Sequence, residues 1–261
     1  MNRTVEDFER MSPELNYEDD YQGLLEQATE GDVDAAHKIA ELSIEHDEPY
    51  LRSLVNQLKE GIQEGRWSAI IGDDRDGRIP ALIIGRLMKR AAHELDTPPP
   101  KQLFMAGGRD VEPFNERDEA LGEHFNKMID QLGQRPLLLT QYIESSNTIY
   151  SLGLKIMQAK YLPFDVAAVT ADTGAEYYLE QLGAPNGLAP GCQVYIGGWI
   201  DDAYQHSAFT GETHFTGLKD KVGAFATPER DPKLRPVINS IREVAYSFAD
   251  RLYKEEFNGE G

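Results

Sequence analysis

The residues best suited to chemistry lie in two polar loops, each between a short apolar run and a helical pattern. The first loop covers residues 73–78 (Asp-Asp-Arg-Asp-Gly-Arg) and follows the apolar run 68–72. The second covers residues 141–148 (Gln-Tyr-Ile-Glu-Ser-Ser-Asn-Thr) and follows residues 136–140. Because the start of a helix presents unpaired backbone N–H groups and the positive end of the helix dipole, such loops suit a phosphate.

The first loop combines positive charge with a flexible backbone. Arg75 and Arg78 are candidate catalytic residues because they could neutralise the oxygens of a diphosphate, and Gly77 permits close backbone approach. Asp73 and Asp74 are candidate ligand-binding residues at the end of the preceding strand. The alternative is ordinary surface structure, in which the aspartates cap a helix and pair with the arginines.

The second loop offers hydroxyl and amide groups to a phosphate. Its candidate binding residues are Thr140, Gln141, Glu144, Ser145, Ser146, Asn147 and Thr148. Plain N-capping of the next helix by Ser145, Ser146 or Asn147 would account for the same residue types. Helix capping explains each loop alone more easily than it explains the presence of both loops in this order along one sheet.

The elements that would position these loops alternate between strand and helix from Trp67 onward, which predicts an α/β fold with an open parallel sheet. The expected strands are 68–72, 102–106, 136–139, 164–169 and 193–196, and the expected helices are 79–92, 117–132, 148–159, 177–182 and 237–253. Both loops then lie at the carboxyl edge of the sheet, where open α/β sheets bind ligands. Residues 197–235 show no regular pattern.

The first 62 residues read as an acidic helical extension. Helices are expected over 21–27, 33–44 and 49–62, with a turn and a helix cap at residues 30–32 and Pro49 in a first turn. The predicted division is therefore an extension over 1–62, an α/β core over 63–200, and an irregular segment with a terminal helix over 201–261.

Charge and composition exclude several classes of protein. The net charge is −19, with fifteen Asp and Glu against three Lys and Arg in residues 1–50, which disfavours nucleic acid as a partner. No apolar run approaches the length of a membrane span, and the N-terminus lacks a secretory signal, so we expect a cytoplasmic protein. The acidic extension is either a solvated helical surface or a docking arm for a basic protein.

Metal and nucleotide motifs of the common kinds are absent from the sequence. The single Cys192 excludes a cysteine-based zinc site and an internal disulfide, and the six histidines form no zinc-binding pair. No Walker loop, nucleophile elbow or Gly-x-Gly-x-x-Gly fingerprint is present. Trp199 follows the last expected strand, where it would either pack against the protein or stack on a base.

The two loops give the chain a resemblance to the type I phosphoribosyltransferases. Residues 70–81 look like the family's diphosphate loop, and residues 137–148 look like the strand and loop that hold the 5-phosphate. The resemblance spans about residues 66–200. It implies a Rossmann-like sheet of the phosphoribosyltransferase type, phosphoribosyl diphosphate as ligand, and a homodimer.

The chain departs from this family at the strand that precedes the phosphate loop. Thr140 and Gln141 stand where the family carries two acidic residues, and Ser146 matches the usual glycine. The resemblance implies Mg²⁺ as cofactor, yet neutral side chains lack the charge that a divalent cation needs. Glu144 would repel a phosphate if it pointed inward.

Three functions therefore remain open. One is a divergent phosphoribosyltransferase that transfers ribose 5-phosphate to a nitrogen acceptor. The second is a non-catalytic protein of the same fold that binds a nucleotide or sugar phosphate. The third is an interaction protein that recruits a partner through its acidic helices.

Overall fold

The computed structural model describes residues 17–73, 77–105, 135–143, 147–160, 162–187, 189–200, 218–222, 225–228 and 232–259. It shows an α/β fold built on an open, five-stranded parallel sheet with the strand order β2-β1-β3-β4-β5. The strands are β1 (Ala69–Asp73), β2 (Lys101–Met105), β3 (Leu137–Ile143), β4 (Phe164–Asp172) and β5 (Val194–Ile200). The α/β class expected from the sequence is confirmed.

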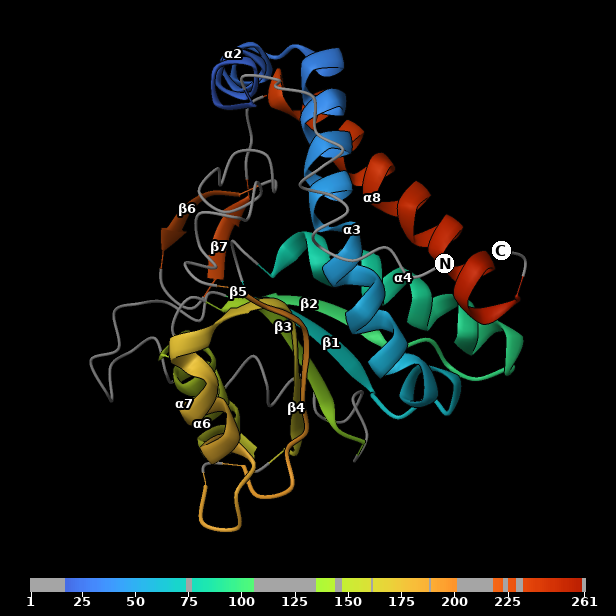
Figure 1. Ribbon diagram of the computed structural model, residues 1–261, viewed down its shortest axis with the longest axis vertical. Helices are drawn as coiled ribbons and strands as arrows, with labels where there is room; N and C mark the ends of the chain where they lie inside the picture. The colour runs from blue at the N-terminus through green and yellow to red at the C-terminus, as the bar shows by residue number, and fades with distance from the viewer. Residues whose placement is uncertain are drawn as a thin grey trace.

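Helices cover both faces of the sheet (Figure 1). One face carries α3 (Val33–Gln63), α4 (Arg78–Glu94) and α8 (Leu234–Phe257). The other face carries α6 (Asn147–Lys160) and α7 (Glu176–Leu182). A further helix, α2 (Tyr17–Thr29), packs against the start of α3. The result is a three-layer arrangement of helix, sheet and helix.

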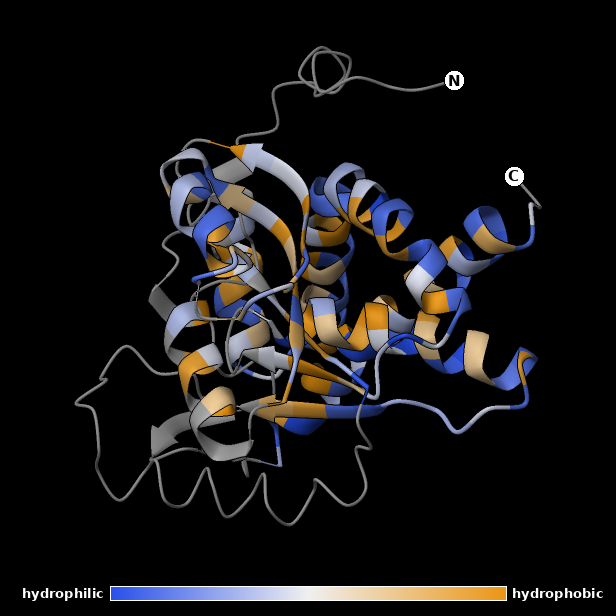
Figure 2. Ribbon diagram, turned by 90° about the horizontal axis from the view of Figure 1, so that it is seen from below, coloured by the Kyte–Doolittle hydropathy of each residue, from blue (hydrophilic) through white to orange (hydrophobic). Residues whose placement is uncertain are grey.

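The strands divide their side chains between two apolar cores. On β3, Leu138 and Tyr142 belong to the core beneath α3, α4 and α8, whereas Leu137 and Leu139 belong to the core beneath α6 and α7. This alternation is the period of two that a strand buried on both faces imposes. Figure 2 shows apolar residues concentrated on the strands and on the helix surfaces turned toward them.

The long helix α3 corrects the expectation of two separate helices over 33–44 and 49–62. It is a single helix of 31 residues with Pro49 in its interior, so Pro49 does not begin a helix. Proline inside a helix costs about 3 kcal/mol because it removes a hydrogen bond and crowds the preceding turn. Residues on both sides of Pro49, including Ile39, Ile44, Leu51 and Leu58, are buried in the same core, and this packing offsets the cost. Asp32 caps the helix through the N–H groups of residues 34 and 35, as the turn signal predicted.

Two further expectations are wrong. The strand expected to end at residue 139 extends to Ile143, and part of the segment expected to be irregular forms the antiparallel pair β6 (Leu218–Val222) and β7 (Phe225–Pro228). The other expected strands and helices within the described residues are present, with ends shifted by a few residues. The helix expected over 117–132 lies outside the described residues.

Ion pairs join the helices of the α3, α4 and α8 layer. Arg52 of α3 contacts Glu255 and Glu256 of α8, at 2.6 and 3.0 Å, and Glu48 of its own helix. Asp250 of α8 accepts from Arg86 and Arg90 of α4. The core under this layer contains residues from all three predicted parts of the chain, so the acidic extension is packed on the sheet from α3 onward. Among the described helices, none is both long enough and apolar enough to cross a membrane.

Candidate functional site at the β1–β3 switch point

The order of the strands reverses its direction between β1 and β3. From β1 the chain crosses through α4 on one face to β2, and from β3 it crosses through α6 on the other face to β4. Helices α4 and α6 therefore begin on opposite faces, next to the carboxyl ends of two neighbouring strands. In doubly wound sheets the crevice at such a switch point is where ligands bind. The two loops singled out from the sequence are the ones that follow β1 and β3.

The first loop lies between β1 and α4. Asp73 is the last residue of β1, paired in register with Met105 of β2. Gly77 is the residue before the first turn of α4, and Arg78 is its first helical residue. Gly77 has φ of −84°, so it does not use the left-handed freedom of glycine. Asp74 and Arg75 lie outside the described residues.

Gly72 allows a close approach of backbone between β1 and the start of α4. A Cβ on Gly72 would lie 2.6 Å from the carbonyl oxygen of Gly77 and 2.9 Å from Cβ of Ala81. The start of α4 therefore rests directly on the end of β1. The sequence signal was a glycine inside an apolar strand, which marks close approach of another segment.

We expect Gly72→Ala to displace the start of α4 and to destabilise the protein by about 1–3 kcal/mol, the usual cost of overpacking. Urea denaturation would measure this loss. Gly23→Ala on α2 is the matched control, because a Cβ there meets nothing within 4 Å and should not destabilise the protein. Equal stability of the two variants would contradict the close packing of α4 on β1.

Arg78 has a defined position beside the second strand of this edge. Its guanidinium carbon lies 4.2 Å from the ring centroid of Phe104 on β2, within the range of a cation–π contact. Phe104 is paired with Gly72, so the contact lies next to the start of α4. The positive charge of Arg78 is thereby held at the β1–β2 side of the edge.

The second loop is shorter than the sequence suggested. Gln141 lies within β3, and Asn147 and Thr148 are the first two residues of α6. The connection between β3 and α6 is therefore residues 144–146, so Glu144, Ser145 and Ser146 lie outside the described residues. A strand that leads through three residues into a helix brings the helix start to the carboxyl edge, as a phosphate loop requires.

Thr140 lies in the middle of β3 and not at its end. It pairs with Gly72 on one side and Ala167 on the other, and it is 1% exposed. Its Oγ1 is buried and has no hydrogen-bond partner among the described residues. A buried hydroxyl without a partner costs free energy, so threonine is less favourable for stability here than an apolar side chain of the same shape would be.

Sequence reasoning missed a buried carboxyl group at the same edge. Asp47 of α3 is 1% exposed and accepts a hydrogen bond of 2.5 Å from the hydroxyl of Tyr142 on β3. Burial raises the pKa of Asp47 to about 7, although the Tyr142 hydrogen bond acts to lower it. The signal that could have found it is helical spacing, because Asp47 lies three residues after Ile44 and four before Leu51 on the buried side of α3.

Tyr142 lies at an irregularity of the sheet. The register between β3 and β4 shifts between Gln141 and Ile143, which places Tyr142 at the irregular position. Such bulges redirect side chains and occur next to functional sites. The Asp47–Tyr142 hydrogen bond thus ties α3 to the segment immediately before residues 144–146.

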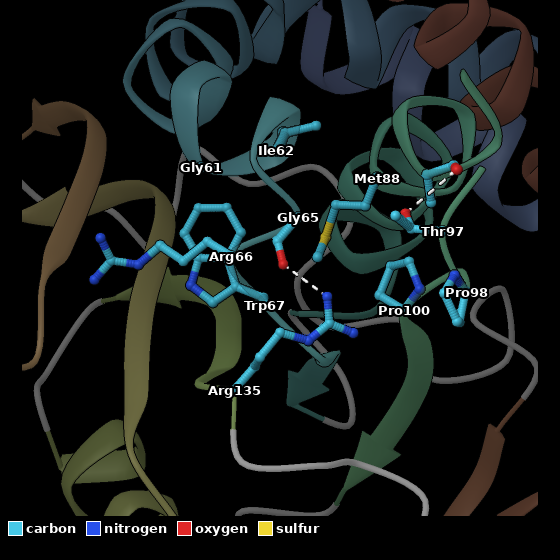
Figure 3. Close-up of a pocket in the computed structure, with 11 residues that line it drawn as sticks. Gly61, Ile62, Gly65, Arg66, Trp67, Met88, Thr97, Pro98, Pro100 and Arg135 are labelled. Atoms are coloured by element: carbon cyan, nitrogen blue, oxygen red, sulfur yellow. Dashed lines mark hydrogen bonds between the residues drawn. The ribbon is translucent and has the colours of Figure 1, made fainter. Parts of the chain in front are cut away.

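A recess at the opposite end of the sheet does not provide a ligand site. It is lined by residues that include Gly65, Arg66, Trp67, Thr97 and Arg135 (Figure 3). Its volume is about 10 Å³, which is room for one water molecule. Arg135 donates to the carbonyl oxygen of Gly65 across it, at 2.8 Å.

The described residues contain no group of three His, Cys, Asp or Glu side chains that could hold a metal ion.

No family model matches the chain, and no curated protein or solved structure shows significant similarity to it.

Proposed function

We propose that the chain binds a phosphorylated ligand, phosphoribosyl diphosphate or a nucleotide, at the carboxyl edge between β1 and β3. The observation that carries this proposal is the switch point, where the two polar loops follow adjacent strands and lead into α4 and α6. Two helix starts at one edge provide unpaired N–H groups for two separate phosphates. A ligand with phosphate at both ends fits this arrangement better than a monophosphate.

The finer proposal is transfer of ribose 5-phosphate to a nitrogen acceptor. The bond from the anomeric carbon to the diphosphate oxygen breaks, the new bond to nitrogen forms, and diphosphate departs with the electron pair. Arg78, with Arg75 from the same loop, would stabilise the departing charge. The start of α6, with Asn147 and Thr148, would hold the 5-phosphate so that the reacting atoms stay aligned.

The alternative is a protein that binds such a ligand without turnover. The observation that favours it is Thr140, a neutral and buried residue where the resembling enzymes carry an acid. Asp47 does not replace that acid directly, because its carboxyl group is buried and accepts the hydrogen bond of Tyr142.

Mg²⁺ does not fit the described part of the site. The cation prefers charged oxygen ligands, and the candidate residues whose side chains are described, Arg78 and Thr140, offer none. We therefore assign no step to Mg²⁺ and treat it as a variable of the experiment.

Calorimetric titration with phosphoribosyl diphosphate, ribose 5-phosphate and pyrophosphate, each with and without Mg²⁺, tests the proposal. The key variant is Asn147→Asp, which keeps the size of the side chain and adds a negative charge at the start of α6. We expect it to weaken binding of the 5-phosphate ligands roughly tenfold. Asn239→Asp, at an exposed position of α8, is the matched control and should bind like the wild type.

The outcomes separate the two forms of the proposal. Release of pyrophosphate in the presence of a nitrogen base would support transfer. Binding without release, across a panel of purine, pyrimidine and amine acceptors, would favour the non-catalytic protein. Absence of binding by all three ligands would contradict both.

A further inference from the structure

A groove lies at the outer edge of the sheet, away from the switch point. It has a volume of about 390 Å³ and runs between α7 and β5. Its apolar lining residues include Leu179, Val194, Ile196 and Trp199. Glu176 and Glu180 line it from α7, and no lysine or arginine is among its lining residues.

One aromatic side chain that lines this groove is exposed. Trp199 is 41% exposed, so an aromatic face is available to a segment bound in the groove. Glu176 and Glu180 are also exposed, and neither has an ion-pair partner within the described part of the chain.

Helix geometry sets the spacing of the two carboxylates. Residues four apart on a helix lie on the same side with Cβ atoms about 5–6 Å apart. Alternate side chains of an extended peptide are about 6.6 Å apart, since each residue advances about 3.3 Å. Two basic side chains separated by one residue therefore match Glu176 and Glu180. The apolar lining would receive the aliphatic stems of these side chains, and Trp199 would receive a guanidinium face.

We propose that this groove, which we call the α7–β5 groove, docks an extended segment of a partner protein that carries two basic residues separated by one. The net charge of −19 favours such a partner over an acidic one and speeds its approach. The proposal does not depend on ligand binding at the switch point. The expectation of a basic partner for the acidic N-terminal helices stays a separate prediction.

Trp199 supplies a direct probe of the groove. The chain has two tryptophans, and the other, Trp67, is 1% exposed. Acrylamide therefore quenches mainly Trp199 in the free protein. The test uses a capped peptide with two arginines separated by one leucine, and an isomer with the two arginines adjacent, titrated against the full chain in low salt. We expect the first peptide to protect the exposed tryptophan from quenching and to bind more tightly than its isomer.

Charge variants test where the peptide binds. The double variant Glu176→Gln and Glu180→Gln should weaken binding roughly tenfold, since it removes two ion pairs. The matched control is Glu26→Gln with Glu30→Gln on and just after α2, which removes the same charge at the same spacing from another exposed surface. This control should leave the affinity unchanged.

Several results would overturn the proposal. If both double variants weaken peptide binding equally, the peptide is attracted by the overall negative charge and not by the groove. If the bound peptide leaves Trp199 open to acrylamide quenching, the peptide binds elsewhere. Self-association that protects Trp199 without peptide, seen by sedimentation, would assign the groove to a second copy of this chain. No binding at millimolar peptide would exclude a basic segment as the occupant.

Discussion

Replacing Asp47 with asparagine should change how the stability of the protein depends on pH. The folded-state pKa of Asp47 is raised from 3.8 to about 7 by burial, so folding favours the protonated carboxyl group. The stability that this preference contributes is fully present below pH 3.8 and is lost as the pH rises through about 7. The asparagine side chain of the variant does not ionise, while its carbonyl oxygen still accepts the hydrogen bond of Tyr142.

The free energies of unfolding of wild type and Asp47→Asn should therefore diverge with pH. A pKa shift from 3.8 to about 7 corresponds to about 4 kcal/mol. Between pH 4 and pH 8 the free energy of unfolding of the wild type should therefore fall by about this amount relative to that of the variant. Urea denaturation at closely spaced pH values measures the difference, and effects of the overall negative charge largely cancel between the two proteins.

Tyr142→Phe provides the complementary variant. The Tyr142 hydroxyl stabilises the ionised carboxylate of Asp47, so its removal should raise the pKa of Asp47 further. The pH-dependent loss of stability should then extend to higher pH than in the wild type. Parallel stability curves for wild type and Asp47→Asn would show that Asp47 is solvated and that α3 does not close over β3.

The elements predicted from the sequence are those whose patterns are local. Alternating apolar runs and helical periods identified β1, α4, β3, α6 and β4 in order, because each element carries its own apolar face. Their order was enough to place the two polar loops on one edge of the sheet. The fold class and the location of the candidate site follow from this reasoning.

The features that the sequence did not reveal depend on contacts between distant segments. Pro49 was predicted to begin a helix because proline in a helix interior costs a large amount of free energy. The helix is continuous because residues on both sides of Pro49 pack in the same core. The end of β3 looked like a loop because Thr140 and Gln141 are polar. Asp47 fell between the two expected helices, and its place on the buried side follows only when α3 is continuous.

Asp165 should be the most costly single side chain to remove at the amino end of the sheet. It lies near the start of β4 and is 2% exposed. Its Oδ2 accepts from Trp67 Nε1 at 2.8 Å and from Arg66 Nε at 2.9 Å, while its Oδ1 accepts from the backbone N–H of Gln193 at 2.8 Å. One carboxylate thus joins the segment before β1 to β4 and to the segment before β5.

Asp165→Ala should destabilise the protein by about 3–5 kcal/mol, because the indole N–H of Trp67 and the N–H of Gln193 lose their acceptor in the interior. Asp165→Asn should cost less, about 2 kcal/mol, since one carbonyl oxygen remains while an N–H₂ group must face one of the donors. Arg66→Ala should cost at most about 1 kcal/mol, because the Arg66 side chain is 31% exposed and water can take its place. Urea denaturation of the three variants measures this order, and an Arg66→Ala loss as large as that of Asp165→Ala would contradict it.

The same variants separate stability from ligand binding. Asp165 lies at the amino end of the strands, whereas the candidate phosphate site lies at their carboxyl end. Without urea, at a temperature where Asp165→Asn remains folded, its affinity for phosphoribosyl diphosphate should equal that of the wild type. Asn147→Asp should be at least as stable as the wild type, because a carboxylate suits the start of a helix, but should bind more weakly. A loss of affinity in Asp165→Asn without unfolding would mean that the two ends of the sheet are coupled, and that the phosphate site extends beyond the switch point.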